Sequence, residues 1–184
     1  MSREVEAGFE PLSGPEIVPG PLAPFARALV VLNLWIVRLG AVALLAAALV
    51  LTYSVVSRYF FKAATDWQDE AAVFCIVGAI FTASAYVQSY RGHIGIELLA
   101  TVLSPRVNRV RAIVVDIASF LFCAFFAWKS WTLWHEALVD KQTTTSSWAP
   151  PLCIPYGLMA FGITLLAVQI ALQIAAELQR RPRP

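Results

Sequence analysis

The segment AAVFCIVGAIFTASAYVQSY, residues 71–90, decides the fold. It holds twenty residues without a charge, between Glu70 and Arg91. A helix needs roughly 20 apolar residues to cross a hydrocarbon core. A charge at the bilayer centre costs roughly 2.5 to 3.5 kcal/mol on insertion scales, so long charge-free runs mark membrane spans. The segment therefore predicts a transmembrane helix.

Three further runs of the chain have the same character. With the first segment they give four expected spans, at about 30–58, 70–90, 110–134 and 154–177. The last begins near Pro155, because prolines 150, 151 and 155 would interrupt a helix interior. None of the runs alternates between polar and apolar residues as a barrel strand does. The sequence predicts an all-α integral membrane protein, with a four-helix domain over 28–178 between a flexible proline-rich tail, 1–27, and a basic tail, 179–184.

The composition of the whole chain agrees with this class. Of its 184 residues, 59% are hydrophobic and 14% are charged, whereas a soluble domain carries about a quarter charged residues. Such a chain is neither a cytosolic globule nor a disordered segment, which needs low hydrophobicity and high net charge. The formal net charge of +2 also excludes a nucleic-acid-binding domain, which needs a strongly basic face.

The distribution of Lys and Arg predicts the orientation, because positive residues are retained on the cytoplasmic side. One side carries nine of them and the other carries four, leaving out the intramembrane Arg38. The first set is Arg3, Arg27, Arg91, Arg106, Arg109, Arg111, Arg180, Arg181 and Arg183, and the second is Arg58, Lys62, Lys129 and Lys141. Both termini are therefore expected to be cytoplasmic.

A short amphipathic helix is expected at about 94–103, between the second and third spans. Its apolar side comprises Ile94, Leu98, Leu99, Val102 and Leu103. Its polar side contains Glu97 and Thr101, so the helix is expected to lie on the cytoplasmic surface.

Tryptophans gather at the expected outer ends of the spans, where indole rings prefer the headgroup level. Trp128, Trp131 and Trp134 are spaced by three. They form either part of this interfacial belt or a docking face for another protein.

No catalytic, cofactor or metal site is expected. The chain has no Walker, GxSxG or HExxH motif. Its two histidines, His93 and His135, fall at opposite ends of spans, about 30 Å apart, so they cannot ligate one haem. A stand-alone carrier is also disfavoured, because internal repeats and interrupted helices are not visible. The chain is thus expected to be a membrane scaffold that works with a partner, and not an enzyme.

A set of short motifs, in a particular order, resembles the small membrane subunit, or DctQ family, of tripartite ATP-independent periplasmic (TRAP) transporters. The motifs are Arg58-Tyr59-Phe60-Phe61, Trp67-Gln68-Asp69-Glu70, Gly78, Arg91-Gly92-His93-Ile94, Glu97 and Ile154-Pro155. The resemblance covers roughly residues 30–175. The family usually has two glutamates after the tryptophan, and Asp69 replaces the first of them here, which keeps the charge.

The resemblance implies a non-catalytic subunit in the bacterial inner membrane. Such a subunit supports a large membrane subunit that carries the transport path. A periplasmic substrate-binding protein delivers a small organic anion, often a carboxylate, and a sodium or other cation gradient drives its uptake. The alternative is a small membrane-anchor or redox-complex subunit.

Several residues are candidates for contacts with these partners. At the outer end they are Arg58, Trp67, Asp69 and Glu70, and at the cytoplasmic end Arg91, His93 and Glu97. Simpler interpretations stay open. Arg91 and His93 would mark the end of the second span, and the two acids would complement the helix dipole. The alternative for the acids is a contact with Arg58 or with the docked binding protein.

Two ionisable residues lie inside the spans. Arg38 and Asp116 each lie about one to two turns into the first and third spans, so their depths agree to within several Å. Intramembrane charges usually face the protein interior and pair. An intramembrane ion pair between Arg38 and Asp116 is expected, with the first and third spans in contact. The alternative is that Arg38 reaches a lipid phosphate while Asp116 is protonated or bonded elsewhere.

Overall fold

The computed structural model describes residues 23–62, 66–90 and 105–179. Its four helices are α1 (Ala23–Phe61), α2 (Asp66–Ser89), α4 (Pro105–Val139) and α5 (Cys153–Gln179). Each is long and apolar enough to span a membrane, and these residues contain no β-strand. The predicted all-helical fold with four spans is confirmed. The expected amphipathic helix at 94–103 lies outside the described residues, as do residues 1–22 of the expected tail 1–27 and residues 180–184 of the expected tail 179–184. Residues 23–27 of the first tail already belong to α1, and residue 179 is the last of α5.

The helices run beyond the expected spans at nearly every end. At about 1.5 Å per residue, the 39 residues of α1 extend about 58 Å and the 35 residues of α4 about 52 Å. A hydrocarbon core is about 30 Å thick, so both helices reach past it or cross it at a tilt. The last helix starts two residues before Pro155, whose missing N–H is harmless in a first turn.

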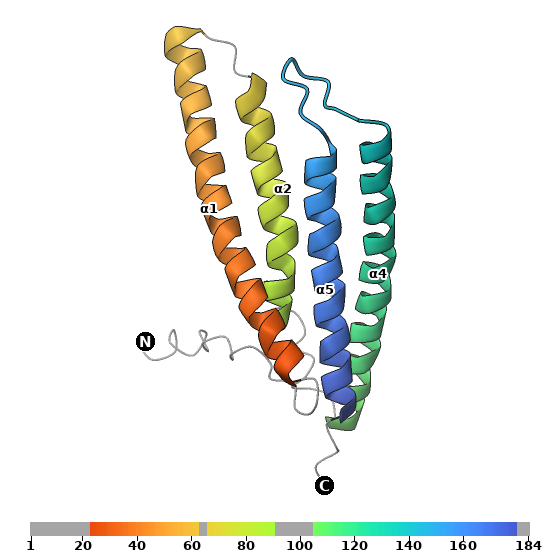
Figure 1. Ribbon diagram of the computed structural model, residues 1–184. Helices are drawn as coiled ribbons and strands as arrows, with labels where there is room; N and C mark the ends of the chain where they lie inside the picture. The colour runs from red at the N-terminus through yellow and green to blue at the C-terminus, as the bar shows by residue number, and fades with distance from the viewer. Residues whose placement is uncertain (1–22, 63–65, 91–104, 180–184) are drawn as a thin grey trace, which may run out of the picture.

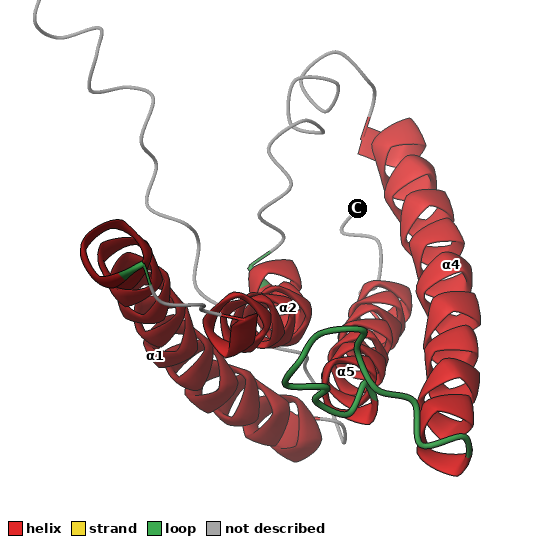
Figure 2. Cartoon of the chain, turned by 90° about the horizontal axis from the view of Figure 1, so that it is seen from above, coloured by secondary structure: helices red, strands yellow, loops and turns green. Residues whose placement is uncertain are grey.

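The helices form a row in the order α1, α2, α5, α4 (Figure 1). Extensive contacts join α1 to α2, α2 to α5 and α5 to α4, and Figure 2 shows the same order from above. Burial follows position in the row. In its most apolar stretch, 50% of α5 is buried, against 11% of α1 and 6% of α4.

This order corrects one expectation from the sequence. The first and third spans, α1 and α4, do not pack together, because α2 and α5 lie between them (Figure 1). Within one chain, the expected Arg38–Asp116 ion pair therefore loses the helix contact on which it depended. Similar depth along the membrane normal does not make two helices neighbours.

Small residues line the contact between α1 and α2. Asn33, Gly40, Ala47 and Ser54 recur every seven residues of α1 and are buried. A seven-residue repeat keeps one helix face against a neighbour, and small side chains let the backbones approach in a membrane. A Cβ atom added at Gly40 would lie 3.5 Å from the Cα of Ala79, an ordinary contact distance.

The contact between α2 and α5 is much closer. A Cβ atom added at Gly162 would lie 2.4 Å from the backbone oxygen of Phe81 and 2.9 Å from the backbone nitrogen of Thr82. Two helix backbones touch here, and only glycine leaves the required space. Nearer the start of α2, a Cβ atom at Gly78 would meet only the side chain of Leu158, at 3.0 Å.

Two tryptophans of α4 contact α5. Trp131 donates a hydrogen bond from Nε1 to Thr164 Oγ1 at 3.0 Å, and Trp134 covers Gly157. In contrast, Trp128 is exposed beside the Lys129 ammonium, which lies 5.0 Å from its ring centroid. Two of the three tryptophans therefore contact α5 of their own chain.

A matched pair of substitutions tests these two helix contacts. Gly162→Ala should destabilise the bundle by about 1 to 3 kcal/mol, the usual cost of overpacking, because the methyl group meets backbone atoms that cannot turn aside. Gly40→Ala should be tolerated, since its methyl group finds ordinary contact distance. The measurement is unfolding of purified protein in detergent. Equal stability of the two variants would contradict the assigned packing.

Candidate partner contacts at the two ends of the bundle

The bundle has two distinct ends, named here by what lies at them. The loop end carries the link between α1 and α2 and the loop between α4 and α5. The terminal end is where α1 begins and α5 ends (Figure 1).

An ion pair joins α1 to α2 at the loop end. Arg58, in the last turn of α1, donates to the Asp69 carboxylate in the first turn of α2. Ser54 donates from Oγ to the other carboxylate oxygen at 3.5 Å. This is the contact with Arg58 that the sequence left open for Asp69. Both charged side chains are 52% exposed, so the pair fixes geometry more than it adds stability.

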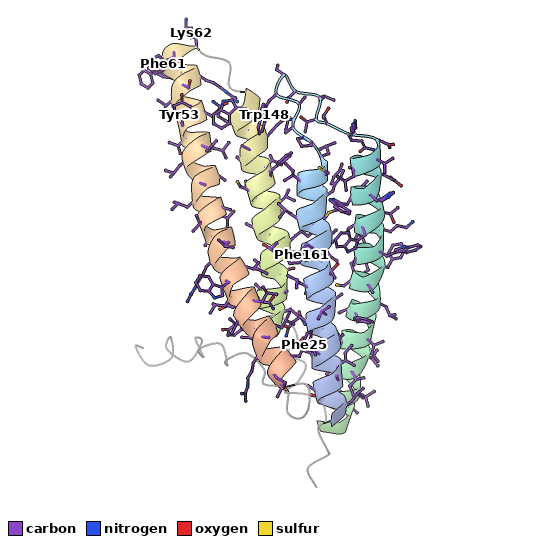
Figure 3. All side chains as sticks on the ribbon, viewed as in Figure 1. Phe25, Tyr53, Phe61, Lys62, Trp148 and Phe161 are labelled. Carbon is purple, nitrogen blue, oxygen red and sulfur yellow. The ribbon has the colours of Figure 1, made fainter. Side chains whose placement is uncertain are left out.

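The loop between α4 and α5 folds back over the start of α2. Backbone hydrogen bonds join Thr144 N to Pro150 O at 3.1 Å and Leu152 N to Gln142 O at 3.0 Å. These hydrogen bonds hold the loop as a compact turn that reverses the direction of the chain. Trp148 from this loop, labelled in Figure 3, meets Trp67 of α2 edge to face, with ring centroids 6.5 Å apart. Trp67 therefore contacts a neighbouring loop of its own chain.

Glu70 differs from its neighbour Asp69. Its side chain is partly buried, and its Oε2 atom is buried with no hydrogen-bond partner among the described residues. In the first turn of α2, a carboxylate complements the positive end of the helix dipole. The two acids thus have separate environments, one paired across α1 and α2 and one turned inward.

A cluster of amide side chains joins three helices toward the terminal end. Gln173 of α5 donates from Nε2 to the backbone oxygen of Gln88 at 2.8 Å, and accepts from Gln88 Nε2 at Oε1 at 2.9 Å. One turn away, Asn33 of α1 donates from Nδ2 to Gln169 Oε1 at 3.5 Å. We call these four residues the amide cluster. It links α1, α2 and α5 without a charge.

The members of the amide cluster are not equally satisfied. Gln173 is 1% exposed and has two short hydrogen bonds. Asn33 is 0% exposed, its only bond is long, and its Oδ1 atom has no partner in the described part of the chain. A buried polar atom without a partner is costly. Gln173 therefore carries most of the stabilisation.

Sequence reasoning missed this cluster because it followed charged residues. A usable signal was present, since Gln169 and Gln173 lie four residues apart on one face of an otherwise apolar helix. Amides in apolar helices seek partners on neighbouring helices.

Tyr86 and Tyr90 meet at the end of α2. Their hydroxyl oxygens are 3.2 Å apart and their ring centroids 5.0 Å apart. The hydrogen bond with Tyr86, together with burial, raises the pKa of Tyr90.

The remaining candidate residues are scattered or not described. Arg91, His93 and Glu97 lie outside the described residues. Arg38 is exposed on α1, with its guanidinium carbon 5.4 Å from the ring centroid of Trp35. Asp116 is partly buried on α4, at the other end of the row.

Four long apolar helices, with their ion pair at one end, define a multi-pass membrane protein. Residues 47–180 match the sequence model of the family described as tripartite ATP-independent periplasmic transporters, DctQ component. The chain belongs to this family. Comparison with curated proteins and with solved structures found no match.

A double-mutant cycle tests the ion pair at the loop end. Arg58→Gln and Asp69→Asn, alone and together, should give a coupling energy of about 0.2 to 1 kcal/mol, as expected for an exposed pair. The coupling should fall as salt concentration rises, because exposed charges are screened. Unfolding in detergent at two ionic strengths measures both effects. A coupling energy of zero at low salt would contradict the presence of this ion pair in solution.

A second comparison tests the amide cluster. Gln173→Leu should lower the free energy of unfolding by about 1 to 2 kcal/mol, because it leaves the Gln88 groups without their partner. Asn33→Leu should cost much less, since it also removes an unsatisfied oxygen. The same detergent unfolding assay compares the two variants. A larger loss for Asn33→Leu would contradict the unequal roles assigned to these residues.

Proposed function

We propose that this chain is the non-catalytic small membrane subunit of a TRAP importer and supports its large membrane subunit. The observation that carries the proposal is the family match over residues 47–180. The low burial of α1 and α4 supports it. Two long apolar faces are left for lipid or for another membrane protein, as a subunit at the side of a transporter requires.

The transport path belongs to the partner in this proposal. Carriers commonly bind their substrate near the bilayer midplane, where discontinuous helices present polar groups. Each described helix is continuous, and the contacts between α1 and α2 and between α2 and α5 are filled by small residues and close backbones. Such a body suits a stationary scaffold.

The proposed orientation places the terminal end in the cytoplasm. The basic residues counted in the sequence favour this arrangement. The tails 1–27 and 179–184 then flank the membrane domain, 28–178, on the cytoplasmic side. The amphipathic segment 94–103 lies on that surface, where Arg91, His93 and Glu97 contact the large subunit.

The loop end then faces the periplasm and takes part in docking the substrate-binding protein. Arg58 and Asp69 offer a half-exposed charge pair there, and Trp67 and Trp148 are exposed beside it. Exposed aromatic and charged groups are typical of recognition surfaces. The imported substrate is a small organic anion, most simply a carboxylate, which enters the inner-membrane complex by symport with a cation.

Reconstitution tests the proposed division of labour. Liposomes containing the purified chain alone should not accumulate a carboxylate under a sodium or proton gradient. Liposomes that also contain its large membrane subunit, with the binding protein added, should accumulate it. Uptake of radiolabelled organic acids is the measurement. Transport by the isolated chain, or full transport by the large subunit without it, would contradict the scaffold role.

A further inference from the structure

Arg38 has an unusual position for a charged side chain in this protein. It lies in α1, about 16 Å along the helix from Arg27 and about 30 Å from Arg58, counted at 1.5 Å per residue. Apolar residues fill almost all of the helix between those two arginines. Charged side chains inside membrane helices almost always face protein or a water-filled cavity. In the isolated chain, however, Arg38 is exposed.

The neighbours of Arg38 hold it in place without neutralising it. Its guanidinium carbon lies 5.4 Å from the ring centroid of Trp35, which is 59% exposed. No carboxylate in the part of the chain that the structure describes forms an ion pair with Arg38. A guanidinium stacked on an aromatic face keeps its hydrogen-bonding edge available.

The exposed face of α1 around Arg38 has the spacing of a helix contact. Trp35, Val42, Leu49 and Val56 recur every seven residues, and all four are exposed. They lie nearly opposite the small residues that pack on α2, because two residues correspond to about 200° around a helix. Tyr53, labelled in Figure 3, is exposed on this same face, about five turns beyond Trp35. We call it the outer face of α1.

We propose that the outer face of α1 receives a transmembrane helix of the large membrane subunit, and that this helix places a carboxylate against Arg38. The inference rests on the proposed function and specifies where the two subunits meet. Charge complementarity selects the occupant. Once a partner helix covers Arg38, its guanidinium needs a hydrogen-bond acceptor. A carboxylate on a rigid helix provides two oxygens for its paired N–H groups.

The cation on the outward face of α4, Lys129 beside Trp128, lies only five residues before the expected outer end of its span, so its ammonium can reach the headgroups. Nearer the middle of the span, this face of α4 is apolar. Its exposed residues Leu121, Phe122 and Phe125 carry no charge, and Phe122 stacks on Phe126 with ring centroids 4.6 Å apart. Lipid tails can cover such an apolar surface.

Photo-crosslinking in membranes locates the contact. The chain, co-expressed with its large membrane subunit, carries a photoreactive residue at Val42 on the outer face of α1 or, as the control, at Phe122 on α4. The Val42 probe should crosslink to the large subunit at least about five times more efficiently than the Phe122 probe. Crosslinks from Val42 to lipid alone, or to a second copy of this chain, would overturn the proposal.

Substitutions of Arg38 then test the charge. Arg38→Leu should lower the amount of large subunit that co-purifies about tenfold, whereas Arg38→Lys, which keeps the charge but not the paired N–H groups, should lower it less. The variant with leucine should still insert, because leucine favours the membrane, and the level of the chain in membranes is measured alongside. Lys129→Leu on α4 is the matched control and should leave co-purification unchanged. Unchanged co-purification by Arg38→Leu would overturn the proposal.

The proposed function and the contact at the outer face of α1 can be disproved separately. If the unmodified chain does not co-purify with the large subunit, the proposed function is wrong and the outer-face contact falls with it. If the complex forms but Arg38→Leu has no effect, only the assignment of this contact is wrong.

Discussion

The backbone contact between α2 and α5 is the constraint on which the rest of the structure depends. At Gly162 the two helices approach so closely that a Cβ atom would lie within 2.4 Å of a backbone oxygen. This contact makes α2 and α5 the inner pair of the row. Glycine-mediated approach replaces the hydrophobic effect, which does not drive helices together inside lipid. The outer helices α1 and α4 each pack against one member of this inner pair.

The row has a consequence for function. A four-helix bundle packed as a square would bury one face of every helix equally, whereas here α1 and α4 each have a single main neighbour. Their outward faces therefore remain available to the surroundings. A subunit shaped in this way has a large surface for a partner and little interior in which to bind a substrate, which agrees with membership of the DctQ family.

Polar groups in this bundle follow two different rules. The ion pair of Arg58 and Asp69 lies at the loop end, half exposed, where water reduces the cost of charge. Toward the terminal end, Gln88 and Gln173 satisfy each other without charge. Arg38 departs from both rules, because it is charged and lies within an apolar helix. That departure is why its surroundings point to a partner.

The sequence by itself determined the four spans, because the cost of charge in a bilayer is local and can be read from charge spacing. It also determined the family, and it offered Arg58 as a partner for Asp69 because only a short loop separates the two helix ends. The tertiary structure alone decided which helices are neighbours. Depth along the membrane brought Arg38 and Asp116 to similar levels, but lateral order depends on where small residues allow backbones to meet, as at Gly162 and Phe81. The amide cluster emerged only from that order, because its members come from three helices far apart in the chain.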